Sequence, residues 1–166
     1  MADDPEFDPI RLLQELNDAG VRFIVIGAVA GRILGSPTLT ADLDVCYARD
    51  PANHAALAAV LQRQHGRLRG ADPGLPFQLD ARTLANGDSF TFETDLGDLD
   101  ILGRPSGTSG YDDLNKTALR ADIDGVVVLV ASIDDLIRMK RAAGRPKDLI
   151  EVEVLGALRD ELDAGG

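Results

Sequence analysis

The chain has 166 residues, enough for one domain with a buried core. Its net charge of −11 argues against a protein that binds nucleic acid over its whole surface. A single cysteine, Cys46, excludes an internal disulfide and a multi-cysteine zinc site. No apolar run approaches the about 20 residues that span a bilayer, and the first residues are acidic. We therefore expect a cytoplasmic protein that does not cross a membrane.

The first half of the chain alternates helical and strand patterns. The pairs Asp8–Pro9 and Asp50–Pro51 predict two helix starts, because aspartate caps a helix and proline suits its first turn. The β-branched run 21–26 predicts a buried strand, and the alternation over 42–47 predicts another. In chain order we expect helix 9–19, strand 21–26, helix 28–34, strand 42–47 and helix 51–65.

The second half begins with an irregular stretch, 67–84, that has room for a short helix. Two strands of a hairpin are expected at 89–94 and 99–102, then a helix at 111–117 and a strand at 126–130. A capping box, Ser132 to Asp135, opens a helix that Gly144 ends. Pro146 starts a last helix with one apolar face formed by Leu149, Val152, Leu155 and Leu158.

These patterns predict an α/β (α+β) fold in a single domain, 1–166. We expect a mixed sheet of about four or five strands flanked by helices. The helices at about 132–163 should pack on that sheet.

Asp42 and Asp44 are the first candidates for chemistry. On a strand they share one face about 6–7 Å apart, where two like charges repel unless a cation such as Mg²⁺ lies between them. The chain has 22 Asp, so about three Asp-x-Asp pairs are expected by chance, and three occur (42/44, 98/100 and 122/124). The pair alone therefore proves little. Asp100 lies in an apolar strand, whereas Asp98 lies near a turn and should be more solvated.

A possible phosphate-binding helix start and a lysine add to the evidence from these carboxylates. A strand ends at Gly27–Ala28, where a helix begins, and free N–H groups there can bind phosphate; a glycine that merely ends a strand is the alternative. Lys140 is one of only three lysines beside 14 arginines. It could bind a polyphosphate, or it could simply extend from a helix end into solvent.

Other chemistries find little support. Cys46 lies next to acidic residues, which raise a thiol pKa. The sequence contains neither a Gly-x-Ser-x-Gly motif nor a Walker A loop. His54 and His65 fall on a polar helix and should be solvated.

The segment from Phe23 to Ala30, with Gly35 and then Thr40-Ala41-Asp42-Leu43-Asp44-Val45, resembles the signature of the DNA polymerase β-like nucleotidyltransferases. The tail 132–148, with Lys140-Arg141 and later Asp148, looks like the AbiEii-type branch, which includes toxins of toxin–antitoxin pairs. The resemblance covers about residues 10 to 160. The chain departs from it at Ala28, where a second glycine is common, and at Thr38, where arginine is common.

The resemblance implies a role for each matched residue. Asp42 and Asp44 would bind a divalent metal, Mg²⁺ or Mn²⁺, together with the triphosphate. Asp100 would be the third carboxylate, which activates the acceptor hydroxyl and joins the metal set. The expected nucleotide and phosphate contacts come from Gly27, Ala28, Thr40, Lys140 and Arg145, with Asp148 holding Lys140.

The implied activity is a nucleotidyltransferase that moves NMP from an NTP to a hydroxyl and releases pyrophosphate. Such a protein could be a toxin acting on tRNA, or on a protein, with a cognate antitoxin as partner. The alternatives are a small-molecule (antibiotic) nucleotidyltransferase, or a catalytically weak relative that acts by binding a nucleotide or a partner. Residues 138–147 hold five bases and no acid, so a local site for a polyphosphate is compatible with the acidic chain.

Overall fold

The computed structural model describes residues 5–72 and 74–165 and contains a seven-stranded mixed sheet of order β3-β4-β5-β2-β1-β7-β6. The predicted α/β class is confirmed, and the five predicted strands are all present. The two additional strands, β3 (Arg67–Leu68) and β6 (Leu119–Ile123), form the two edges of the sheet. Edge strands are short or solvated on one side, so they lack the apolar pattern that identified the inner strands.

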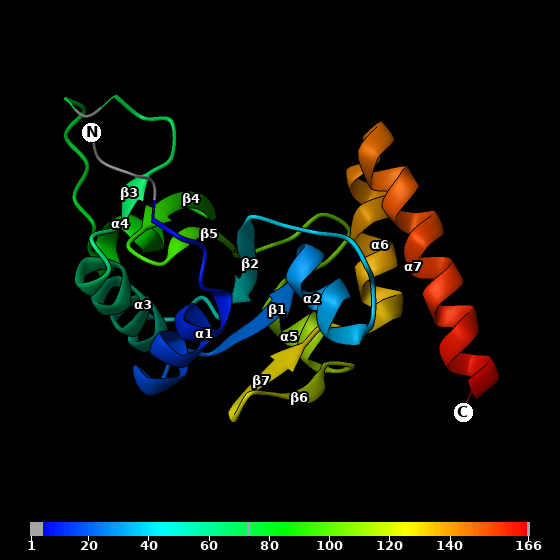
Figure 1. The fold of residues 1–166 in the computed structure, drawn as a ribbon. Helices are drawn as coiled ribbons and strands as arrows, with labels where there is room; N and C mark the ends of the chain where they lie inside the picture. Colours follow the sequence, from blue (N-terminus) through cyan, green and yellow to red (C-terminus); the bar gives the residue numbers. More distant parts are fainter. Residues whose placement is uncertain (1–4, 73, 166) are drawn as a thin grey trace.

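The helices and strands follow one another along the chain as Figure 1 shows. The remaining bounds are α1 Pro9–Asp18, β1 Phe23–Ile26, α2 Gly27–Leu34, β2 Asp42–Tyr47, α3 Pro51–Arg63, α4 Ala81–Asn86, β4 Ser89–Thr94, β5 Gly97–Leu102, α5 Tyr111–Asn115, β7 Val126–Val130, α6 Ile133–Ala143 and α7 Pro146–Gly165. The stretch expected to be irregular, 67–84, thus contains β3 and the start of α4.

The two expected proline-led helices begin as predicted. The Asp8 side chain accepts a hydrogen bond from the Arg11 backbone N–H at 3.1 Å, and Asp50 caps α3 through the Asn53 N–H at 3.0 Å. At the other end of the chain, Ser132 caps α6 by accepting from the Asp135 N–H at 3.1 Å. These local bonds fix where α1, α3 and α6 begin.

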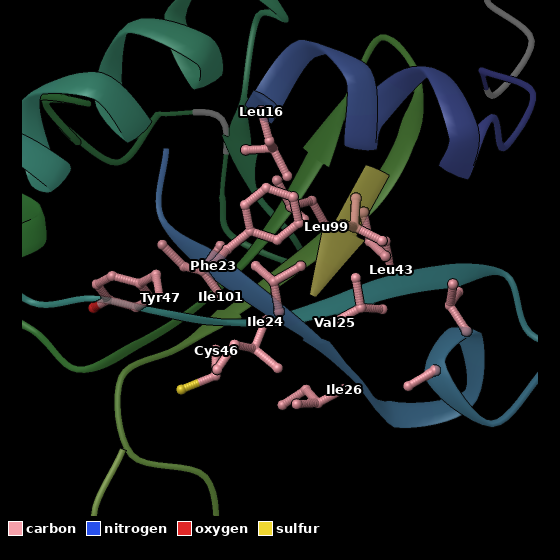
Figure 2. Close-up of a cluster of buried hydrophobic side chains, with 14 of the residues drawn as sticks. Leu16, Phe23, Ile24, Val25, Ile26, Leu43, Cys46, Tyr47, Leu99 and Ile101 are labelled. Atoms are coloured by element: carbon pink, nitrogen blue, oxygen red, sulfur yellow. The ribbon is translucent and has the colours of Figure 1, made fainter. Parts of the chain in front are cut away.

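The centre of the sheet is buried on both faces. All four residues of β1 are buried, and Leu43, Val45 and Leu99 of the neighbouring strands are fully so. Figure 2 shows Leu16 of α1 above Phe23 of β1. Each such side chain contributes about 1.5–3 kcal/mol by leaving water, so the strands that carry Asp42 and Asp100 are held rigidly.

Strand register brings distant acidic residues together. β2 runs antiparallel to β1 and parallel to β5, which places Asp42 beside Asp98 and Asp44 beside Asp100. Ile26, the last residue of β1, pairs with Asp44. The start of α2 therefore lies next to the carboxylates.

The C-terminal helices lie beside α2, with α7 outermost, beyond α6 (Figure 1). Only part of the predicted apolar face of α7 is covered: Leu155 is 3% exposed, but Leu149 is 50% exposed. A spacing of three residues drifts around a helix of 3.6 residues per turn, so Leu149 and Leu155 face different directions. Within the described residues, no helix is long and apolar enough to cross a membrane.

One expectation about the histidines is wrong. His54 is buried, 6% exposed, because its face of α3 packs under Tyr47, with the ring centroids 6.0 Å apart. Burial, and then the nearby charge of Arg49, lower the pKa of His54. His65 is exposed as predicted and pairs with Asp95 at 2.6 Å.

Cys46 is unsuited to nucleophilic chemistry, as predicted. It is fully buried, and burial, followed by the charges of Asp88 and Asp113, raises its pKa to about 12. Desolvation therefore raises the pKa of Cys46 more than the neighbouring acidic residues do. The thiol lies 3.8 Å from the Gly103 carbonyl oxygen.

Candidate active site

Three carboxylates meet at the centre of the sheet. Asp42 and Asp44 extend from β2 and Asp100 from β5, and one oxygen of each lies within 4.8 Å of those of the other two. Strand register sets this geometry, because parallel neighbours place Asp44 beside Asp100 and the period of two places Asp42 on the same face. We call these three residues the acidic trio.

Without a bound cation, the carboxylates of the acidic trio are partly buried and repel one another. Burial, and then the charges of Asp42 and Asp100, raise the pKa of Asp44 from 3.8 to about 7. Burial also raises the pKa of Asp100, against the opposing charge of Arg69. A bound divalent cation would relieve this repulsion, and three hard oxygen donors on rigid strands suit Mg²⁺ or Mn²⁺.

Gly27 fits against the acidic trio more closely than any other residue type could. Its φ is +68°, and a Cβ there would lie 2.9 Å from the carboxyl carbon of Asp44. α2 begins at Gly27, and among the described residues no side chain caps its start. Its first N–H groups are thus available beside the carboxylates, where the helix dipole favours an anion such as phosphate.

A second charged cluster, formed by Asp148 with Lys140 and Arg145, lies near the acidic trio, where the charge of Lys140 opposes the rise in the pKa of Asp44. Asp148 is buried and accepts hydrogen bonds from the Arg145 side chain at 2.6 and 3.1 Å and from its backbone N–H at 3.2 Å. Lys140 also reaches Asp148, at 3.5 Å. The Arg145 bonds, aided by the Lys140 charge, hold the pKa of Asp148 at about 2, so this buried carboxylate stays ionised and fixes both cations.

One pocket of about 540 Å³ joins these parts. The size is typical of a small-ligand site. Its lining includes the acidic trio, Gly27 and Ala28, together with Lys140, Arg145 and Asp148. The structure therefore brings together eight of the nine residues expected at the site.

Thr40 is the ninth, and it lies outside the lining of this pocket. Its hydroxyl bonds the carboxylate of Asp42 at 2.9 Å, and it also lies 3.1 Å from the Asp42 carbonyl oxygen. This position suits a residue that orients Asp42 rather than one that contacts a nucleotide.

Sequence reasoning missed two residues at the site. The Glu151 carboxylate lines the pocket and accepts a hydrogen bond from the Thr38 hydroxyl at 3.1 Å, which ties the loop after α2 to α7. Arg69 lies against the acidic side and pairs with Asp42, Asp98 and Asp100. Neither had a local signal: Glu151 lies on a helix face, and Arg69 lies in the stretch read as irregular.

No family model matches the sequence, and no protein of curated function matches it. Similar solved structures exist, all of low sequence identity. The lincosamide antibiotic adenylyltransferase LnuA, bound to lincomycin, matches with a TM-score of 0.61 and 11% identity, over 90% of this chain and 95% of that one. The antibiotic-resistance factor ANT(2'')-Ia matches with a TM-score of 0.54 and 15% identity, over 94% and 89%.

A candidate nucleotidyltransferase of Thermotoga maritima also matches, with a TM-score of 0.52 and 18% identity, over 94% of this chain and 91% of that one. At these identities the likeness concerns the fold alone. The chain therefore has the fold of nucleotidyltransferases.

Proposed function

We propose that this protein is a metal-dependent nucleotidyltransferase that moves NMP from an NTP to a hydroxyl acceptor. One observation carries the proposal: a single pocket is lined by the acidic trio, by Lys140 and Arg145, and by the start of α2. The arrangement offers carboxylates for a divalent cation and N–H and cationic groups for phosphates. The nucleotidyltransferase fold of the chain supports the same reaction.

Each residue has a defined task in this proposal. Asp42 and Asp44 hold the cation, Mg²⁺ or Mn²⁺, and Asp100 completes its carboxylate set. When bound, the ion neutralises charge that develops on the transferred phosphate. Lys140 and Arg145, fixed by Asp148, bind the triphosphate.

The reaction balances with these groups alone. The acceptor oxygen bonds to the α-phosphorus of the NTP, and the bond from that phosphorus to the oxygen bridging the β-phosphate breaks. Pyrophosphate leaves with that electron pair. Asp100, the third carboxylate, takes the acceptor proton.

For the acceptor, we propose a small molecule with a hydroxyl group. LnuA and ANT(2'')-Ia, which the fold resembles over most of both chains, are respectively an antibiotic adenylyltransferase and an antibiotic-resistance factor. The strong net negative charge of −11 disfavours a long contact with RNA. The rival acceptors are tRNA and a protein hydroxyl, as for an AbiEii-type toxin with an antitoxin.

The experiment incubates the protein and Mg²⁺ with each α-labelled NTP and three acceptor pools: hydroxylated antibiotics, total tRNA and cell lysate. Label in a small molecule supports the proposed acceptor, whereas label in RNA or protein supports the toxin alternative. Asp100→Asn should abolish transfer. Asp122→Asn is the matched control, because it removes the same charge at the β6–β7 turn, outside the acidic trio and its ion pairs.

A protein that binds nucleotide without transferring it is the remaining alternative. Thr38 favours it, because its hydroxyl is bonded to Glu151 where the nucleotidyltransferase signature commonly has an arginine. Calorimetric binding of NTP with Mg²⁺, lost in Asp44→Asn, together with no transfer to any of the three pools, would establish this alternative.

A further inference from the structure

Arg69 is the one cationic side chain that touches the acidic trio directly, among the ion pairs of residues 5–72 and 74–165. Its Nη1 lies 3.2 Å from an Asp98 oxygen and 3.7 Å from an Asp42 oxygen, and its Nη2 bonds Asp100. Two of the three carboxylates that would hold the metal are thus already paired with a guanidinium.

Strand pairing explains how Arg69 reaches this position. The Arg69 backbone N–H donates to the Thr91 carbonyl at 2.9 Å, and Thr91 is paired with Asp100 on the next strand. Arg69 therefore continues the β3–β4 pairing and lies two strands away from Asp100, within reach of a long side chain. Its side chain is 29% exposed at the sheet edge, so it can turn into solvent without disturbing the core.

A divalent cation held by the acidic trio and this guanidinium would both need the carboxylates of Asp42 and Asp100, and the two positive charges repel each other. Arginine keeps its charge at every accessible pH, so it can leave the site only by moving. The site therefore contains its own competitor for the metal.

Resting on the proposed function, we propose that Arg69 is the resting counterion of the acidic trio and is displaced when the divalent cation binds. In the metal-free protein it neutralises Asp42 and Asp100. When the cation is present, Asp100 is released from Arg69. The metal affinity of the wild-type protein is lowered by this competition.

The test measures Mn²⁺ binding by isothermal titration calorimetry at pH 8 and low salt. Arg69→Gln should bind Mn²⁺ about five- to tenfold more tightly than wild type. The cation then no longer has to break one partly buried ion pair in order to bind. Arg67→Gln is the matched control: it removes the same charge from the same edge, but Arg67 is 73% exposed and pairs with Glu93. The Mn²⁺ dissociation constant of Arg67→Gln should stay within about twofold of the wild-type value, because the substitution removes only one exposed ion pair. Equal or weaker binding by Arg69→Gln than by Arg67→Gln would overturn the proposal.

A second measurement does not depend on the variant folding. In ¹⁵N-labelled wild-type protein, the Arg69 Nε signal should shift as Mg²⁺ saturates the site, while the Arg67 signal stays in place. Saturation without an Arg69 shift would contradict displacement. If wild type and Asp44→Asn bind Mn²⁺ equally, the acidic trio is no metal site, and the proposed function fails together with this inference. Trio-dependent binding without an Arg69 effect overturns this inference alone.

Discussion

Gly27 and Asp44 approach so closely that a Cβ on residue 27 would lie 2.9 Å from the carboxyl carbon of Asp44. The contact joins the start of α2, which can bind phosphate, to the carboxylate whose pKa is raised to about 7. Phosphate and metal would therefore be held by adjacent groups on rigid elements.

Gly27→Ala should consequently reduce nucleotidyl transfer at least 100-fold, because either Asp44 or the start of α2 must move. The positive φ adds a stability cost of about 1 kcal/mol. Gly20→Ala separates the two effects: Gly20 has φ +74°, and no described atom lies within 4 Å of a Cβ there. It should lose similar stability in thermal melts while keeping its activity. Equal loss of activity in both variants would show that strain, not the contact with Asp44, is responsible.

Divalent cations should stabilise the folded protein through the acidic trio. At a Mn²⁺ concentration 100 times the dissociation constant, the expected gain in unfolding free energy is about 2.7 kcal/mol. Differential scanning calorimetry with and without Mn²⁺ should show this gain in wild type and its loss in Asp44→Asn. Asp122→Asn, at the β6–β7 turn, should respond as wild type does. A full Mn²⁺ response in Asp44→Asn would place the ion elsewhere.

In the metal-free protein, Asp44 should make stability depend on pH. Its pKa of about 7 lies above the unfolded value of 3.8, so the folded state binds a proton that the unfolded state has lost. The stabilisation is complete below about pH 4 and is lost as pH rises through 7, by about 1–3 kcal/mol. Urea unfolding in EDTA at pH 5, 6, 7 and 8 measures this slope. Asp44→Asn should flatten it, and an unchanged slope would assign the effect to other groups.

Asp148 should matter for both stability and nucleotide binding. Asp148→Asn leaves Lys140 and Arg145 without their anionic partner, which should cost about 1–3 kcal/mol and raise the KM for NTP about tenfold. Because its pKa is lowered to about 2, the stabilisation is present above pH 4 and is lost as pH falls toward 2.

Asp134→Asn is the control for this variant, since Asp134 is 74% exposed and pairs with Arg159 at 3.0 Å. Removing such an exposed pair should cost less than about 1 kcal/mol and leave the KM unchanged. If Asp148→Asn lowers stability but leaves the KM for NTP unchanged, the cluster around Asp148 serves only the fold.

The inner architecture could be predicted from sequence because its signals are local. The proline-led helices, the capping box at Ser132 and the five inner strands each depend on a few neighbouring residues. β6 was missed because its residues are exposed at the sheet edge, and β3 because two residues carry no pattern. His54 was misjudged because the covering of its helix face depends on strands far along the chain.

The residues of the candidate site also divide into those that local sequence signals identify and those that they do not. Asp42, Asp44 and Gly27 lie in one short segment and could be singled out together. Asp100 was singled out from its place in an apolar strand, but only the parallel pairing of β2 and β5 brings it near the other two carboxylates. Arg69 and Glu151 could not be found: each reaches the site across strands or helices whose register local patterns do not encode. The roles of all these residues stay predictions until transfer is measured.

The central claim is that this pocket transfers a nucleotidyl group. Parallel reactions with α-labelled and γ-labelled NTP, Mg²⁺ and the three acceptor pools test it most directly. We expect the α-label to move to an acceptor and the γ-label to appear only in pyrophosphate. With Asp44→Asn, we expect neither label to leave the NTP. Transfer of the γ-label to an acceptor, or α-label transfer that survives in Asp44→Asn, would contradict it.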